Sequence, residues 1–208
     1  DGELKINKRA VTLKSADLSK TYDGTALVNG ATALATETGW VNGEGATYTF
    51  TGSQLDEGKS ANSYTYSLNE NTKATNYTIS KSEGELTVNA IATEIVITAA
   101  SDSKTYDGSK LENGGYTYTE GVLVEGDKLT ATVEGEITDY GTTGTAANKV
   151  TGYKVMRGET DVTKNYTFGE SVDGELKINK RAVTLKSADL SKTYDGIALV
   201  NGETALAT

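Results

Sequence analysis

Hydrophobic and polar residues alternate along much of this chain, which is the period of a β-strand with one buried face. In GELKINK, at residues 2–8, Leu and Ile alternate with polar residues, and RAVTLKS, at residues 9–15, repeats the pattern with Val and Leu. Further segments rich in Thr, Tyr, Val or Ile suit a half-buried sheet. They predict strands within residues 46–52, 62–68, 93–99, 128–137 and 151–156.

Asp-Gly and Asn-Gly pairs separate these segments and favour a positive φ and type I′ turns. The pairs are Asp23-Gly24, Asn29-Gly30, Asn42-Gly43, Asp107-Gly108 and Asn113-Gly114. No long stretch has helical period, although one or two helical turns per unit are compatible with the sequence, for example at residues 52–62. The pattern therefore predicts an all-β protein.

The chain also repeats itself, and a period of tens of residues indicates an array of similar units. Residues 1–36 recur at 173–208 with only two differences. A weaker copy lies between them, with an offset of 84 residues from Tyr22 to Tyr106 and of 88 from Tyr106 to Tyr194. The order of the units is thus A–B–A.

The repeats divide the chain into four expected parts. Residues 1–8 correspond to the last strand of a preceding unit, 9–89 to unit A, 90–180 to unit B, and 181–208 to the truncated start of another A-type unit. Short connections without Gly/Ser-rich or Pro-rich linkers predict a semi-rigid, elongated rod of tandem small β domains. Residues 181–208 are expected to dock on unit B or to pair with residues 1–8 of a neighbouring molecule by strand addition.

Composition narrows the possible functions. The chain has no Cys, no His and a formal net charge of −9. These features remove disulfides, thiolate sites and His-dependent triads, and they argue against nucleic acid and polybasic membrane contacts. No apolar run is long enough to cross a bilayer. No calcium loop or nucleotide-binding motif is present, so we expect no metal, no cofactor and no enzymatic activity.

KTYDG near the start of each unit, NYT two-thirds along, and a closing GELTVN or GELKIN strand occur in tandem. This combination resembles the YDG and MBG domains of bacterial surface proteins. The resemblance covers essentially the whole chain and implies β-grasp-like or immunoglobulin-like modules. It also implies an extracellular location, on the bacterial cell surface, in a long secreted adhesin.

The sequence SKTYDG occurs at residues 19–24, 103–108 and 191–196, either as a binding motif or as a strand that runs into a turn. Its presence in every unit favours the structural interpretation, with Tyr packing on the sheet and Asp-Gly forming the turn. The signature residues are Lys20, Tyr22, Asp23, Gly24, Lys104, Tyr106, Asp107, Gly108, Lys192, Tyr194, Asp195 and Gly196.

A second hypothesis for the same lysines is an intramolecular isopeptide bond, which joins a Lys to an Asn beside a buried acid in some Gram-positive surface domains. The candidate pairs are Lys20 with Asn76 and Lys104 with Asn165. The competing interpretation is that the lysines are solvated and that the Asn side chains cap turns.

Together these observations predict a stalk segment that presents or spaces a binding region, with neighbouring repeats as partners. The alternative is a carbohydrate- or protein-binding module in which exposed Tyr faces contact a host or environmental ligand. Candidate faces carry Tyr48, Tyr64, Tyr66, Tyr116 and Tyr118, and the single Trp, Trp40, is expected to pack.

Overall fold

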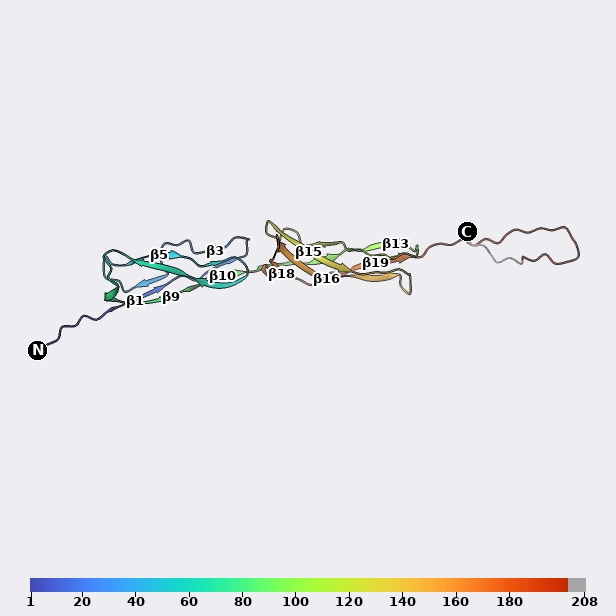
Figure 1. The fold of residues 1–208 in the computed structure, drawn as a ribbon. Helices are drawn as coiled ribbons and strands as arrows, with labels where there is room; N and C mark the ends of the chain where they lie inside the picture. Colours follow the sequence, from blue (N-terminus) through green and yellow to red (C-terminus); the bar gives the residue numbers. More distant parts are fainter. Residues whose placement is uncertain (202–208) are drawn as a thin grey trace. The chain divides into compact units, whose positions relative to one another are not determined.

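The structure, a computed structural model, describes residues 1–201 and is mainly β (Figure 1). The described residues contain no helix beyond two single 3-10 turns, η1 at Ala74–Asn76 and η2 at Thr163–Asn165. The all-β prediction is confirmed. A helical turn at residues 52–62 is wrong, because this segment forms strands β6 (Ser53–Gln54) and β7 (Gly58–Asn62), and β7 completes a sheet beside β10.

Contacts divide the chain into two compact units. Unit 1 contains residues 1–97, 117–132 and 152–171, and unit 2 contains residues 98–116, 133–151 and 172–208. Unit 1 therefore includes the whole first repeat together with three segments of the second, residues 90–97, 117–132 and 152–171. The predicted boundary between repeats, at residues 89 and 90, is a sequence boundary and stays a prediction.

Within unit 1 the first repeat forms two three-stranded sheets, in the orders β4-β1-β9 and β2-β10-β7. The pairs β1–β9 and β10–β2 are parallel, whereas β1–β4 and β10–β7 are antiparallel. Two further antiparallel pairs, β3–β6 and β5–β8, complete it. The remaining strand bounds are β1 Arg9–Lys14, β2 Leu18–Thr21, β3 Leu27–Val28, β4 Thr36–Thr38, β5 Ala46–Phe50, β8 Tyr64–Leu68, β9 Tyr77–Ser82 and β10 Gly84–Asn89.

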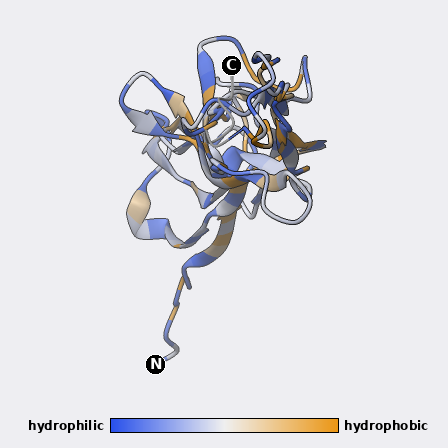
Figure 2. Ribbon diagram, turned by 90° about the vertical axis from the view of Figure 1, so that its right-hand side faces the viewer, coloured by the Kyte–Doolittle hydropathy of each residue, from blue (hydrophilic) through white to orange (hydrophobic). Residues whose placement is uncertain are grey.

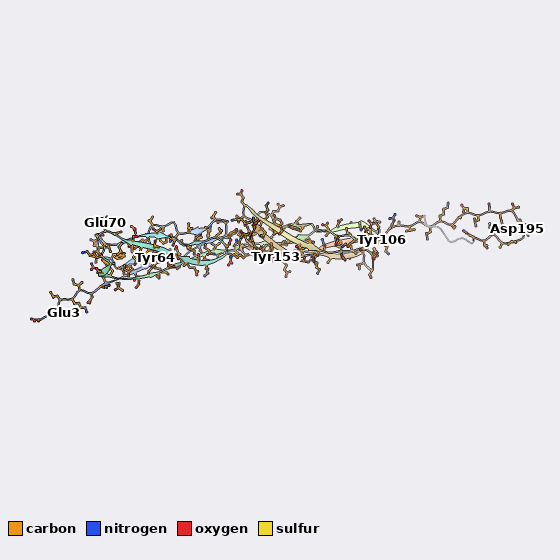
Figure 3. All side chains as sticks on the ribbon, in the orientation of Figure 1. Glu3, Tyr64, Glu70, Tyr106, Tyr153 and Asp195 are labelled. Atoms are coloured by element: carbon orange, nitrogen blue, oxygen red, sulfur yellow. The ribbon has the colours of Figure 1, made fainter. Side chains whose placement is uncertain are left out.

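The core of the first repeat consists of Val11 and Leu13 from β1 with Tyr64 and Tyr77. Alternation places Val11 and Leu13 on one face of β1, as the sequence pattern predicts. Figure 3 marks Tyr64 among the strands of this repeat, where it is 1 % exposed. Aromatic side chains bury much area each, so these two tyrosines supply a large part of the hydrophobic stabilisation.

A tight corner joins the two sheets of the first repeat. The chain leaves β1 and enters β2 through residues 15–17, and here the Asn62 side-chain amide donates to the Ala16 carbonyl at 2.8 Å. Beside it, the Gly84 N–H donates to the Ser15 hydroxyl at 2.8 Å. A Cβ on Gly84 would lie 2.2 Å from the Ala16 oxygen, so only glycine fits at the start of β10.

The second repeat has equivalent pairings. β18 pairs in parallel with β11, as β9 does with β1. β19 lies between parallel β13 and antiparallel β16, as β10 lies between β2 and β7. Its strands are β11 Ile91–Ile95, β12 Ile97–Ala99, β13 Asp102–Thr105, β14 Tyr116–Tyr118, β15 Asp127–Glu134, β16 Thr145–Arg157, β17 Thr160–Asp161, β18 Tyr166–Phe168 and β19 Gly174–Asn179.

In unit 2 the corresponding corner is formed in the same way. The Asn148 amide donates to the Ala100 carbonyl at 2.8 Å, and a Cβ on Gly174 would lie 2.2 Å from that carbonyl oxygen. Leu176 and Ile178 from β19 form a small core with Leu111. The two repeats thus share a corner as well as a strand order.

Residues 2–7 do not form the expected strand. They have the same sequence as β19, yet Leu4 and Ile6 are fully exposed, whereas Leu176 and Ile178 are completely buried. The alternation of hydrophilic and hydrophobic residues is visible on this N-terminal stretch in Figure 2. Alternation defines the two faces of a strand, but a strand forms only where a neighbouring strand makes hydrogen bonds to its backbone N–H and C=O groups.

The prediction of type I′ turns is also wrong. Gly24, Gly43 and Gly108 have φ near +80°, but no non-glycine residue has positive φ in the described part of the chain. Type I′ needs positive φ at both central residues, so the Asp or Asn before each glycine rules this turn out.

Candidate functional site

The signature motif folds into a compact turn closed by its own side chains, which we call the signature turn (residues 20–25 in the first copy). The Lys20 ammonium donates to Asp23 Oδ1 at 2.7 Å and to the Thr25 carbonyl at 2.6 Å. The same Asp23 oxygen accepts the Thr25 N–H at 2.9 Å. Gly24, at φ +80°, reverses the chain without strain.

The contact between lysine and aspartate and the positive φ of the glycine recur in all three copies of the signature turn. Lys104 donates to Asp107 at 2.8 Å and to the Ser109 carbonyl at 2.6 Å. Lys192 lies 2.8 Å from Asp195, which Figure 3 marks on the segment after β19. These hydrogen bonds hold the pKa of all three Asp carboxyls below the usual value. The turn is thus set by local interactions, since it also forms in the truncated third copy.

The structure gives the isopeptide candidates other partners. The ammonium groups of Lys20 and Lys104 donate to nearby residues of their own repeats, at 23–25 and at 107–110, respectively. Asn165 bonds to Asp56 and to the Glu57 N–H, and Asn76 is exposed.

We expect the intact mass of the purified protein to equal the mass calculated from its sequence. Attack on an amide needs a free neutral amine, whereas the side chains of Lys20 and Lys104 donate to a carboxylate and a carbonyl of their own turns. Each Lys–Asn bond would remove one ammonia, so a mass lower by one or two ammonia molecules would establish the bond.

The hydroxyl of Tyr22, at the start of the first signature turn, points to a buried acid of the second repeat within unit 1. It donates to Asp127 Oδ2 at 3.2 Å, and the Tyr166 hydroxyl donates to the same oxygen at 2.6 Å. Arg157 Nε donates to Asp127 Oδ1 at 2.6 Å. The Asp127 side chain has no exposed surface, so these three groups provide the stabilisation that water would otherwise give its carboxylate.

Arg157 extends this cluster to the backbone of the turn. Its Nη1 donates to the Gly24 carbonyl at 2.9 Å, and its guanidinium lies 5.5 Å from the centre of the Tyr22 ring. The Tyr22 and Tyr166 rings meet edge to face at 5.8 Å. We call Tyr22, Gly24, Asp127, Arg157 and Tyr166 the Asp127 joint, since they connect the first signature turn to the second repeat.

Secondary structure positions each member of the joint. Tyr22 directly follows β2, and its N–H donates to the carbonyl of Asn89, the last residue of β10. Asp127 begins β15, Arg157 ends β16 beside the short β17, and Tyr166 begins β18. Every side chain of the cluster thus belongs to a residue at the end of a strand or directly after it.

A second set of contacts lies beside the joint. Asn165 Oδ1 accepts the Glu57 N–H at 2.6 Å, and its amide nitrogen donates to Asp56 at 2.9 Å. Lys164 donates to the Glu57 carbonyl at 3.0 Å. Asn165 is completely buried by these contacts, so the loop before β7 also binds the second repeat.

We expect the joint to weaken above about pH 10, where an unperturbed tyrosine ionises. Burial and the charge of Asp127 raise the pKa of Tyr22, and burial with the hydrogen bond to Asp127 raises the pKa of Tyr166. Because the folded state holds these protons more tightly, their contribution is complete below pH 10 and falls as pH rises toward the folded-state values. Urea midpoints between pH 8 and 11 should therefore fall less steeply in Tyr22→Phe than in Tyr194→Phe, a control at a 92 % exposed position.

The aromatic residues proposed as a binding face are largely internal. Tyr48, Tyr66 and Trp40 pack on the first-repeat core, and Trp40 meets Tyr77 edge to face at 4.9 Å. Packing of Trp40 is therefore confirmed. Tyr116 and Tyr118 are half-buried on one side of β14.

No protein family, curated protein or solved structure matches this chain. Within residues 1–201 no group of acidic side chains has the arrangement of a metal site. The same residues include no helix of the length and apolarity that a membrane span requires.

Proposed function

We propose that this chain is a structural repeat segment of a bacterial secreted or cell-surface, adhesin-like protein, in which an elongated, semi-rigid array presents or spaces a binding region. The observation that carries the proposal is the Asp127 joint. The first signature turn binds the second repeat through the hydroxyl of Tyr22 and the carbonyl of Gly24. An array needs residues that hold one repeat against the next, whereas a catalytic centre has no need of such residues.

The short link between repeats supports the same function. Only Ala90 separates β10 from β11, so hinge freedom is small even before the joint forms. The joint adds hydrogen bonds to a buried charge, which are stronger than those between neutral groups. Together they make bending between the repeats costly.

The test is a distance measurement between spin labels in the two repeats. The chain has no cysteine, so Glu70→Cys in the first repeat and Lys154→Cys in the second, both at exposed positions of unit 1, give one defined label pair. We expect a single narrow distance distribution that broadens when Asp127→Ala is added. A broad distribution in the parent pair would contradict the spacer function.

One observation favours the alternative of a binding module. Tyr153 is 43 % exposed and stacks on Phe168 with ring centres 4.2 Å apart, which gives an aromatic surface of the kind that sugars contact. A glycan array probed with the parent chain and with Tyr153→Ala discriminates the two functions. Binding that is lost in Tyr153→Ala supports the module, and absence of binding supports the spacer.

A further inference from the structure

Part of the acceptor arrangement that receives Tyr22 in the second repeat, namely a carboxylate bound by a tyrosine hydroxyl, recurs in the first repeat. In the second repeat the Val124 N–H donates to the Tyr166 hydroxyl at 3.0 Å, and that hydroxyl donates to Asp127. In the first repeat the Val41 N–H donates to the Tyr77 hydroxyl at 3.2 Å, and that hydroxyl donates to Glu44.

The backbone supports this equivalence. The Glu44 N–H donates to the Val41 carbonyl at 2.9 Å, as the Asp127 N–H donates to the Val124 carbonyl at 3.0 Å. Val41 and Val124 are 83 residues apart along the chain, and so are Glu44 and Asp127. A carboxylate, a tyrosine hydroxyl and a tight turn thus recur at corresponding places.

The two acceptors differ in what covers them. In the second repeat Asn165 is 0 % exposed, because residues 56 and 57 of the first repeat bind it. Its counterpart Asn76, at the same place before the Tyr of NYT, is exposed. Residues 56 and 57 thus cover the acceptor of the second repeat at Asn165, whereas the acceptor of the first repeat is exposed at Asn76.

A matching donor is also exposed. The turn of Lys104, Asp107 and Ser109 reproduces the hydrogen bonds of the first signature turn. The Tyr106 N–H donates to the Asn179 carbonyl at 2.8 Å, as Tyr22 does to Asn89. Yet Tyr106 is 39 % exposed, whereas Tyr22 is 3 % exposed.

We propose that Val41, Glu44, Asn76 and Tyr77 form a docking site for the Tyr106 signature turn of a second copy of this chain. The order of repeats identifies this occupant. In the sequence the second repeat is followed by the start of a unit of the first type, so in an array the Tyr106 turn is next to a unit of the type that carries Glu44. The inference rests on the proposed function, because it extends the Asp127 joint to the other junction of the array.

Docking between copies is weak and head to tail. Within an array the covalent link supplies a high effective concentration, whereas separate molecules have only their bulk concentration. The site and the turn are different surfaces, so the contact is heterologous and adds molecules in one direction.

The experiment is a titration of ¹⁵N-labelled chain with unlabelled chain, followed by amide chemical shifts at about 0.15 M ionic strength, where surface charges farther apart than about 8 Å are screened. We expect progressive shifts at Val41, Glu44, Asn76 and Tyr77. Unlabelled Tyr106→Ala should abolish these shifts. Unlabelled Tyr194→Ala, which removes the same residue of the same motif from the truncated third copy, should leave them unchanged.

Labelled Glu44→Gln tests the other side of the contact and should reduce the shifts at least several-fold. Equal shifts with Tyr106→Ala, or no shifts up to millimolar protein, would overturn the docking site. Either result leaves the intramolecular joint testable by itself. The spin-label distances report on that joint at low concentration and do not depend on docking between copies.

Discussion

Replacing Asp127 by alanine is expected to lower the free energy of unfolding by about 3 kcal/mol, because it leaves Arg157 and two tyrosine hydroxyls without their shared acceptor. The Asp127 side chain is completely buried, while that of Arg157 is 30 % exposed. Water therefore reaches part of the guanidinium, which puts the cost at the lower end of the range for a broken buried pair. Urea unfolding followed by circular dichroism, and by the fluorescence of Trp40, measures the loss.

A matched control separates burial from charge. Asp173 pairs with Lys149 at 3.6 Å, with side chains 46 % and 62 % exposed, respectively. Asp173→Ala should cost no more than about 1 kcal/mol, since exposed ion pairs contribute little. Adding Arg157→Met to Asp127→Ala should recover part of the stability, because no unpaired charge is then buried. Equal losses from Asp127→Ala and Asp173→Ala would show that the joint contributes nothing beyond a surface pair.

The sequence identified the signature motif but not its partner. Repetition of SKTYDG indicated a structural turn, and the local bonds among Lys20, Asp23 and Thr25 agree with that interpretation. Asp127 and Arg157 could not be paired with Tyr22 in this way. They are 105 and 135 residues distant from it, and no rule of spacing joins a tyrosine to an acid across two repeats.

One signal for the acceptor was present in the sequence. NYT recurs in both repeats, at residues 76–78 and 165–167, and reads as a strand. In both places its tyrosine begins a strand and its hydroxyl bonds an acid, Glu44 or Asp127. A tyrosine that recurs at a strand end has a hydroxyl that needs a partner when buried, so the motif predicts a nearby acceptor without identifying it.

The corner asparagines were not predicted either. Asn62 and Asn148 are completely buried, and each bonds a carbonyl where the chain passes from one strand to the next. Asparagine in a polar, Thr-rich sequence reads as a surface or turn residue. Only the close approach of Gly84 and Gly174 to the same carbonyls shows why the GEL strand begins with glycine in both repeats.

The close approach of Gly84 to the Ala16 carbonyl predicts the second large effect on stability. Gly84→Ala should lower the stability of the first repeat by about 3 kcal/mol, the upper part of the range for overpacking, because the new Cβ meets the backbone of Ser15 and Ala16 rather than a flexible side chain. Its ideal position lies 2.2 Å from the Ala16 oxygen and 2.6 Å from the Ser15 oxygen. Relief requires β10 to move away from the corner, which weakens the bond from the Asn62 amide to Ala16.

The measurement is urea unfolding followed by Trp40, the only tryptophan, which packs on the first-repeat core. Gly152→Ala is the matched control, since its Cβ would meet nothing within 4 Å and its φ is not in the left-handed region. Alanine there should change the free energy of unfolding by no more than about 0.5 kcal/mol. Gly174→Ala should give the same loss in the second repeat, read from faster amide hydrogen exchange in β19. If Gly84→Ala and Gly152→Ala shift the Trp40 transition equally, close packing at the corner is not what requires glycine.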